Sequence, residues 1–451
     1  MRCRRYSRLL LALIFLLPVF ACNLPGYASK PSIPLSAVQL RQTMAALTPE
    51  ATATLDLRMD GTATQTPLPT SGPALQNPQL LPDSELVYSP SNVGFNLAGF
   101  IQDAGGYLSA YTETVDGEEL SGAATIQRVA TDLSVNPRLL LALLEFRSHW
   151  VLGEPSDSAA VDHPIGFYVP GRSGLYQEIM ITATQLNVAY YGWRQGTFSE
   201  IEYKDGGKAS LDPGLNAGSV ALQHVLATLY REEDWTEALY GAQGVLPLYQ
   251  EMFGDPWQRA AGVEPLFPPD LAQPALELPF PPGERWSLTA GPHPSWNAGT
   301  PRGALDFSPV TGEAVCAVSR LWVTASAEGV IARSGNHTIV LDLNGDGYEQ
   351  TGWALVYFHL AGPDMAPAGL QVELDYPLGH PSCEGGRATG KHVHMARKYN
   401  GEWLPADGPI PFVLSGWQAH ADERNYYGTL VKGDQIIGSN SSGARTSIIV
   451  R

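Results

Sequence analysis

Apolar residues recur at every third or fourth position over much of the first half of this 451-residue chain. Such spacing gathers the apolar side chains on one stripe of a helix, which can then pack against other helices. Pro137 stands at the start of one such segment, where its missing amide donor does no harm. Helices are therefore predicted at residues 122–133, 136–150, 176–193, 215–230 and 235–240. Together they predict a mostly α domain over residues 85–262.

The pattern changes after residue 284, where short apolar runs are separated by Gly, Pro, Asn and Asp. Such runs are typical of antiparallel strands joined by turns. In the run 353–360, strict alternation places His359 on the same strand face as Leu355 and Tyr357. The clearest predicted strands cover residues 317–325, 330–332, 338–343 and 353–360. An all-β antiparallel domain is therefore expected over residues 285–451.

Two segments lack apolar periodicity and are predicted to be linkers. Residues 23–84 are rich in Thr, Pro and Ala, which cannot form a packed core, so an extended spacer is expected there. Within it, only residues 39–46 could form a short helix. Residues 263–284 contain seven prolines, which favour a fairly stiff connector and forbid a long helix.

The first 22 residues have the pattern of an export signal. Four arginines among the first eight residues precede an unbroken apolar run over residues 9–17, too short for an ordinary membrane-spanning helix. Residues 19–22 resemble a bacterial lipobox in which Cys22 would receive a lipid, although Phe20 stands where a small residue is usual. The mature protein is expected outside the cytoplasm, either anchored at the cell surface on the outer face of the membrane or secreted.

The chain is strongly acidic, with a formal net charge of -17. This charge argues against binding nucleic acid or other anionic polymers by bulk attraction. It does not restrict which neutral or cationic substrate is bound.

Candidate metal ligands lie in the predicted β domain. On a strand, His392 and His394 would point to the same side. Asp306 lies in an apolar run, where a bare charge is costly to bury, thirteen residues after His293. His293, Asp306 and His394 thus offer three protein ligands, the arrangement of a catalytic zinc site with an open fourth position. His392 and His359 would remain as histidines that exchange protons, although His-x-His also occurs on ordinary solvated strands.

These residues carry a resemblance to a known family. The pattern of His293 with Asp306, then Tyr357-x-His359, then Gly390-x-His392-x-His394 resembles the zinc peptidases of the lysostaphin and LasA (β-lytic) type, which cut glycine-containing peptides of bacterial cell walls. It covers about residues 284–430.

This resemblance implies that Zn²⁺ is bound by His293, Asp306 and His394 and that His359 and His392 are catalytic. The expected partners are peptidoglycan or other glycine-rich peptides, hydrolysed by zinc-activated water. In such relatives a tyrosine beyond the His-x-His also faces the reaction intermediate. Tyr426 and Tyr427 lie at a suitable distance downstream but in no diagnostic motif, so neither is assigned.

Residues 134–148 resemble the catalytic helix of lysozyme-like lytic transglycosylases, which implies a lysozyme-like fold for residues 85–262. In that family the catalytic acid immediately precedes a serine, a place held here by Arg147. Glu145 lies two residues earlier, about 200° around a helix, so it cannot simply replace that acid. A module that binds glycan or only spaces the peptidase is favoured over one that cuts glycan.

Two further motifs leave alternatives open. Cys3 would leave with the signal and Cys22 would carry the lipid, so Cys316 and Cys383 either pair, as is usual in an exported domain, or stay free. Residues 342–347 match the start of a calcium loop, but Trp353 stands where a bidentate Glu is needed. A β-hairpin turn is therefore favoured there.

The sequence as a whole predicts a multidomain protein, with a mostly α lysozyme-like module followed by an all-β antiparallel zinc peptidase domain. Two other functions remain open. One is a non-catalytic cell-wall-binding or scaffold protein with a vestigial metal site, against which the intact set of five residues argues. The other is a secreted protease that acts on external proteins.

Overall fold

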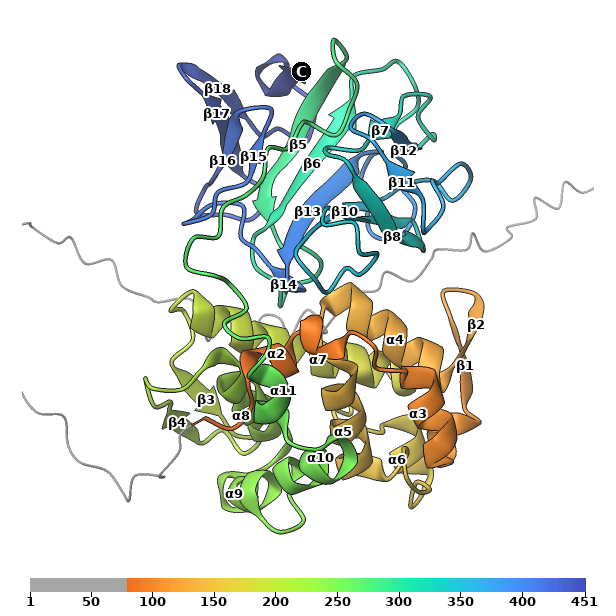
Figure 1. Cartoon of the computed structure of the whole chain (residues 1–451), viewed down its shortest axis with the longest axis vertical. Helices are drawn as coiled ribbons and strands as arrows, with labels where there is room; N and C mark the ends of the chain where they lie inside the picture. The colour runs from red at the N-terminus through yellow and green to blue at the C-terminus, as the bar shows by residue number, and fades with distance from the viewer. Residues whose placement is uncertain (1–78) are drawn as a thin grey trace, which may run out of the picture. The chain divides into compact units, whose positions relative to one another are not determined.

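The computed structural model of the protein describes residues 79–451 (Figure 1). The predictions for the signal, the lipidated Cys22, the helix at 39–46 and most of the spacer lie outside the described residues. Among the described residues, no helix combines the length and apolar character needed to cross a membrane.

The first part of the described chain is helical. Its five predicted helices are present as α4, α5, α7, α8 and α9, within a few residues of the expected ends. Side chains of Ser121, Asn136 and Asn216 cap α4, α5 and α8 by accepting a backbone N–H of the first turn. The helices are α2 (Asp83–Leu86), α3 (Leu97–Ala104), α4 (Gly122–Leu133), α5 (Pro137–Ser148), α6 (Ser158–Asp162), α7 (Leu175–Arg194), α8 (Ala217–Leu229), α9 (Glu232–Tyr240), α10 (Val245–Phe253) and α11 (Pro256–Ala260).

Two short hairpins interrupt the helices, β1 (Thr112–Val115) with β2 (Glu118–Ser121) and β3 (Glu200–Glu202) with β4 (Lys208–Ser210). Helix α5 lies at the centre of the helical region, because every residue from Leu139 to Leu144 is buried. The helices therefore bury their apolar faces in one cluster, as the helical spacing predicts.

The second part is a nine-stranded antiparallel sheet with the order β11-β8-β9-β10-β13-β6-β5-β19, in which β14 also pairs with β13 (Figure 1). Central strands β10, β13 and β6 are flanked by hydrogen-bonded neighbours on both sides. The strands are β5 (Arg285–His293), β6 (Ala304–Pro309), β8 (Gly329–Gly335), β9 (Thr338–Asp342), β10 (Trp353–Phe358), β11 (Gln371–Val372), β13 (Val393–Tyr399), β14 (Glu402–Trp403) and β19 (Ile448–Val450).

Two smaller sheets accompany the large one. One has the order β15-β16-β17-β18, and the other pairs β12 with β7. Their strands are β7 (Val323–Thr324), β12 (Pro377–Gly379), β15 (Val413–Leu414), β16 (Trp417–Ala421), β17 (Gly428–Lys432) and β18 (Gln435–Gly438). The predicted all-β antiparallel character of this region is therefore confirmed.

The two faces of the large sheet are buried differently. Phe307, Tyr357 and Met395 belong to the core of the β region. Ala304, Ala354 and Ala396 project from the other face and join the apolar cluster of the helical region. Asp306 lies two residues from Ala304 on β6, and His394 lies two residues from Ala396 on β13. Because side chains two residues apart on a strand share a face, Asp306 and His394 lie on the face of these alanines.

One strand prediction is wrong, and a second strand is present but ends two residues early. Residues 317–325 are mostly loop, and only Val323–Thr324 forms a strand. The run 353–360 ends as a strand at Phe358, because His359 has a φ of 66° and leaves the extended conformation. Strand alternation therefore does not set the direction of the His359 ring.

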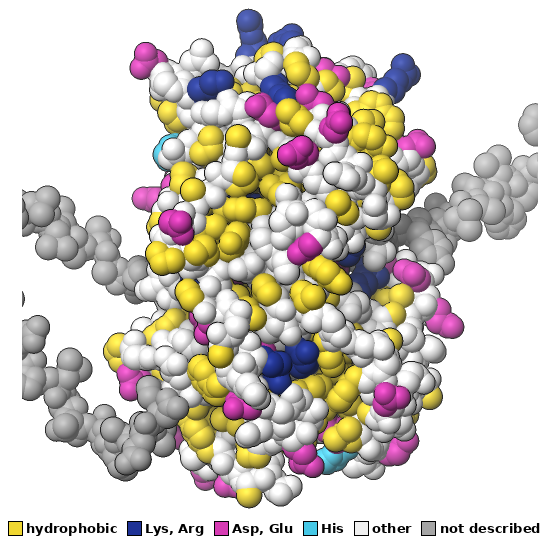
Figure 2. Space-filling model, in the orientation of Figure 1, with side chains coloured by type: hydrophobic (Ala, Val, Ile, Leu, Met, Phe, Trp, Pro, Cys, Tyr) yellow, Lys and Arg dark blue, Asp and Glu magenta, His cyan; other side chains and the backbone are white. Residues whose placement is uncertain are grey.

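The absence of a helix from residues 263–284 and the turn after β9 are as predicted. Residues 263–284 contain no helix or strand, although Leu276, Leu278 and Phe280 pack into the β core. After β9, both carboxylate oxygens of Asp342 accept backbone N–H groups, from Asn344 and Gly347. That segment connects β9 to its antiparallel partner β10, as expected for a hairpin turn. Charged side chains of both signs are interspersed on the face shown in Figure 2, without a broad basic patch.

Candidate active site

Three predicted ligands converge from three neighbouring strands. His394 on β13 stands directly opposite Asp306 on β6. His293 ends β5, where a register shift after Ala290 brings it opposite Ala304. Asp306 Oδ1 lies 3.3 Å from His293 Nε2 and 3.2 Å from His394 Nδ1. All three side chains are buried and form the one group in the described chain that meets the distance criterion for a metal site.

Backbone carbonyls fix the protonation of both imidazole ligands. His293 Nδ1 lies 2.9 Å from Gly291 O, and His394 Nε2 lies 2.9 Å from Ser295 O. A neutral ring that donates through one nitrogen presents a lone pair on the other. Those two remaining nitrogens, His293 Nε2 and His394 Nδ1, are only 3.0 Å apart. Two facing lone pairs repel each other, so the arrangement suits a cation between them.

The carboxylate supplies independent support for a metal. Asp306 Oδ1 is buried and has no hydrogen-bond partner among the described residues. An orphaned buried oxygen of this kind is expensive unless a cation satisfies it. Burial alone would raise the pKa of Asp306, but positive charge on the adjacent His293 and His392 rings, when they are protonated, holds it well below its usual range. Asp306 is therefore ionised, and a set of two imidazoles and a carboxylate fits a zinc ion.

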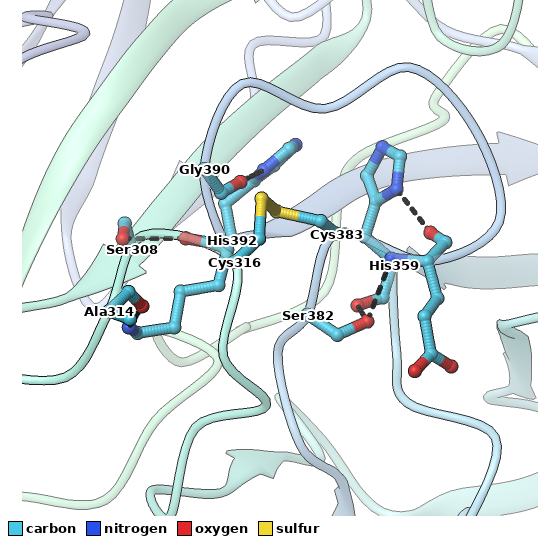
Figure 3. Close-up of a disulfide and its surroundings, with 10 residues drawn as sticks. Ser308, Ala314, Cys316, His359, Ser382, Cys383, Gly390 and His392 are labelled. Atoms are coloured by element: carbon cyan, nitrogen blue, oxygen red, sulfur yellow. Dashed lines mark hydrogen bonds between the residues drawn. A yellow bond between two sulfur atoms is a disulfide. The ribbon is translucent and has the colours of Figure 1, made fainter. Parts of the chain in front are cut away.

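The other two predicted histidines lie beside this set. His359 Nδ1 lies 2.7 Å from Glu384 O, and His392 Nδ1 lies 2.8 Å from Gly390 O (Figure 3). Their ring centroids are 4.5 Å apart, and His392 Nε2 is 3.6 Å from Asp306 Oδ2. Donation through Nδ1 leaves Nε2 of each ring free to accept a proton. Burial, followed by the neighbouring His392, lowers the pKa of His359 to about 3.

Tyr426 is the site residue that sequence reasoning named without assigning. Its ring stacks on His293, with centroids 4.6 Å apart and an angle of 23° between the planes. Backbone hydrogen bonds from Gly291 N to Tyr426 O and from Tyr426 N to Pro292 O hold it there. Tyr427 instead packs against Arg424, whose guanidinium lies 4.1 Å from the ring centroid. The one feature of the sequence that pointed to Tyr426 was its position downstream of the His-x-His motif.

The expected disulfide is present. Cys316 and Cys383 are bonded, with their Cα atoms 5.3 Å apart. The bond joins two loops on either side of His359 and His392 (Figure 3). Neither cysteine is therefore available as a metal ligand.

In the helical region, the side chains of Glu145 and Arg147 both form hydrogen bonds to neighbouring segments of the protein. Glu145 is buried, and its Oε2 accepts the N–H groups of Val151 and Leu152 at 2.8 Å each. Arg147 donates from Nε to Ile165 O at 2.8 Å and also contacts the Tyr230 hydroxyl. Both side chains stabilise the loops that follow α5.

The chain is similar in sequence to several known proteins. Residues 79–268 match the family model described as LasA, N-terminal domain. Protease LasA of Pseudomonas aeruginosa is 28% identical over 321 residues, which cover 65% of this chain and 71% of that protein. The β-lytic metalloendopeptidase of Achromobacter lyticus is 29% identical over 159 residues, or 34% of this chain and 39% of its own length. Among solved structures, the metalloprotease pseudoalterin from the deep sea is 23% identical, covers 37% of this chain and 96% of its own, and has a TM-score of 0.32.

The expected resemblance to LasA and the β-lytic peptidases is therefore confirmed, and the chain is a metalloendopeptidase. The helical region is similar to the N-terminal domain of LasA. Its lysozyme-like character remains a prediction.

Proposed function

We propose that this metalloendopeptidase is an exported zinc enzyme that hydrolyses glycine-containing peptide bonds of peptidoglycan. The observation that carries the zinc assignment is the convergence of His293, Asp306 and His394 around the unpartnered Oδ1 of Asp306. Two imidazole nitrogens and a carboxylate are common zinc donors. In tetrahedral geometry with bonds of 2.0–2.1 Å, donor atoms lie about 3.3 Å apart, close to the separations observed here.

The geometry suggests a separate catalytic role for each of the two histidines that are not metal ligands, His359 and His392. When bound, zinc would polarise the scissile carbonyl and lower the pKa of water beside it. His392 bonds to Gly390 O through Nδ1 and directs Nε2 toward Asp306, so this nitrogen can accept the proton of that water and return it to the leaving amine. The low pKa of His359 makes it a poor proton acceptor. His359 would instead orient the water by accepting a hydrogen bond.

The aromatic surroundings support a substrate with small side chains. Tyr426 stacks on His293 on one side. Phe358 packs against His359, with ring centroids 4.1 Å apart, and Trp296 packs on Phe358 at 4.8 Å. These rings narrow the space around the donor atoms. A glycine at the scissile bond removes the Cβ that would otherwise meet them.

Export is supported by the signal pattern of residues 1–22 and by the Cys316–Cys383 disulfide, because such bonds persist in oxidising compartments. A lipid on Cys22 and the spacer of residues 23–84 would then place the enzyme at the outer face of the membrane. Residues 85–262 would form a lysozyme-like wall-binding or spacing domain, joined by residues 263–284 to the peptidase domain at 285–451. No observation favours external proteins over cell-wall peptides.

Digestion of purified peptidoglycan by the full chain tests the proposal. New amino termini at glycine, identified by mass spectrometry and absent with a His394→Ala variant, are expected. A wild-type enzyme that carries zinc but releases no wall peptides, while cutting soluble proteins, would assign it to the external-protease alternative. Binding of the wall without any cleavage would support the scaffold alternative.

A further inference from the structure

We propose that the Cys316–Cys383 disulfide positions the two non-ligand histidines, so that full turnover requires the oxidised protein. The inference rests on the proposed function, since it assigns catalytic roles to His359 and His392. It concerns the two loops that the bond joins, residues 310–322 and 380–391.

The loop on the Cys383 side holds His359. Ser382 precedes the cysteine and donates to His359 O twice, from its backbone N at 2.8 Å and from its hydroxyl at 2.9 Å. Glu384 follows the cysteine, and its carbonyl oxygen lies 2.7 Å from His359 Nδ1. Both chain neighbours of Cys383 therefore fix the position and the tautomer of His359 (Figure 3).

The loop on the Cys316 side holds the residue before His392. Lys391 donates from its backbone N to Val315 O at 2.8 Å and from Nζ to Ala314 O at 2.7 Å. His392 N in turn donates to Ser382 O at 3.3 Å, which links the two sides. The two histidine rings thus depend on two loops whose covalent connection is the disulfide.

Apart from the Lys391 hydrogen bonds, the loop has few anchors close to Cys316, although further along it Ser319 N donates to Pro381 O at 3.1 Å and Leu321 O lies 3.0 Å from His380 Nδ1. Residues 310–322 contain no helix or strand. Val315 and Val318 are 67% and 46% exposed, so these apolar side chains do not anchor the loop in a core. Since a cross-link limits the conformations of a chain most where other contacts are few, its loss should free this loop first.

The metal ligands are held differently. His293 and His394 donate to Gly291 O and Ser295 O, and Asp306 lies within β6 between β5 and β13. None of these positions falls in the two loops joined by the disulfide. Loss of the bond should therefore displace His359 and His392 while the three metal ligands stay in place.

The consequence is an enzyme that gains activity on oxidation. Cys316 is exposed, so the pair can be reached by thiols. In thiol–disulfide exchange, the two cysteine thiols and one disulfide of an oxidant yield the protein disulfide and two oxidant thiols. Before this exchange, in a reducing compartment, the enzyme would hold its metal but turn over slowly.

The full-length, zinc-loaded chain is treated with a phosphine reductant, which takes oxygen from water as the disulfide becomes two thiols. Thiol content, zinc content, kcat and KM for a glycine-containing peptide are measured before and after. We expect two new thiols, unchanged zinc, KM within about threefold and a fall in kcat of about 100-fold, the scale of a small misplacement of catalytic groups. Reoxidation should restore kcat.

The Cys316→Ser/Cys383→Ser double variant is the matched control, because the reductant should not change its low kcat. NMR of the histidine ring nitrogens distinguishes this positioning role of the disulfide from a general effect on stability. Reduction should leave the signals of His293 and His394 in place and mix the tautomers of His359 and His392. If kcat stays within twofold after two thiols appear, or zinc leaves together with activity, the proposal is wrong. No cleavage by the oxidised wild type would instead refute the proposed function.

Discussion

His293 Nε2 and His394 Nδ1 lie 3.0 Å apart, although each ring already donates through its other nitrogen to a backbone carbonyl. The pair is therefore arranged for a shared cation rather than for a mutual hydrogen bond. We expect the purified full-length protein to hold about one equivalent of zinc, and His293→Ala or Asp306→Ala to lose it. Metal analysis by mass spectrometry decides this.

His420 provides the control for zinc binding. Its Nδ1 lies 3.8 Å from Asp407 Oδ2, the described residues offer it no third ligand, and its side chain is 42% exposed. His420→Ala should keep the full zinc content. A folded wild type that takes up no zinc, or equal losses in all three variants, would contradict the ligand assignment.

His392 should be needed for turnover and not for metal binding. It approaches Asp306 through Oδ2, whereas the ligand set converges on Oδ1. His392→Ala is expected to retain zinc while kcat falls about 100-fold to 10,000-fold, the range for loss of a general base. Parallel peptide-cleavage and metal assays check both parts. Turnover within tenfold of the wild type would remove His392 from the mechanism.

Adjacent Tyr426 and Tyr427 should differ sharply in their effect on catalysis. Tyr426 is 55% exposed, and partial desolvation, followed by the charge of Asp306, raises its pKa, so its hydroxyl is protonated and can donate to a developing negative charge. Tyr426→Phe keeps the ring that stacks on His293 but should lower kcat about tenfold to 100-fold. Tyr427→Phe, which keeps the packing on Arg424, should change kcat less than twofold. Equal effects would show that Tyr426 acts only through packing.

Acid should destabilise the helical region through His224. Its Nε2 lies 2.8 Å from Gln185 Oε1, its Nδ1 has no partner among the described residues, and burial lowers its pKa to about 4. Because the unfolded ring has a pKa near 6.5, the unfolded state binds more protons between pH 6.5 and pH 4. Stability is therefore full above pH 6.5 and falls as the pH drops toward 4.

Denaturant unfolding at pH 7 and pH 5 measures this loss. His224 should contribute about 2 kcal/mol to the difference in unfolding free energy between the two pH values. His224→Gln keeps a polar side chain without the titration and should show a correspondingly smaller difference. The exposed His420→Gln should behave as the wild type. An unchanged pH dependence in His224→Gln would exclude His224 as the cause.

Periodicity predicted the elements that have a strong local signal. Helix α4 has the predicted bounds because its apolar spacing and the Ser121 cap agree. The strand prediction for residues 317–325 was wrong because some of their apolar side chains, such as Val318, face solvent in a loop. The short hairpins β1–β2 and β3–β4 are too brief for a periodic pattern.

The candidate metal ligands could be predicted from the types of residue and their spacing in the sequence. His293, Asp306 and His394 meet because the strand pairing of β5, β6 and β13 brings them together, as the motif spacing indicated. The ring direction of His359 depends on its left-handed φ, and strand alternation could not supply that. Tyr426 reaches His293 through contacts of a distant loop, which Arg302 holds by donating to Asp422 O and Arg424 O. Such long-range contacts leave no local pattern.

The helical region should release no sugar ends from cell wall. Glycosidic cleavage needs a protonated carboxylic acid aimed at the glycosidic oxygen. The Glu145 carboxylate instead accepts the backbone N–H groups of Val151 and Leu152, so it is directed at the loop after α5. Arg147, at the place of the usual acid, bonds to Ile165 and Tyr230. Mass spectrometry of wall digests by the full chain should therefore detect peptide cuts without new reducing ends or anhydro-sugars.

Glu145→Gln separates a structural role from a catalytic one. The variant keeps the shape of the side chain but loses two charge-assisted hydrogen bonds, so we expect a loss of about 1–3 kcal/mol in stability. Its wall products should match those of the wild type in kind and amount at temperatures where it is folded. Sugar ends that are released by the wild type and vanish in Glu145→Gln, while peptide cuts persist, would make the protein a second enzyme as well.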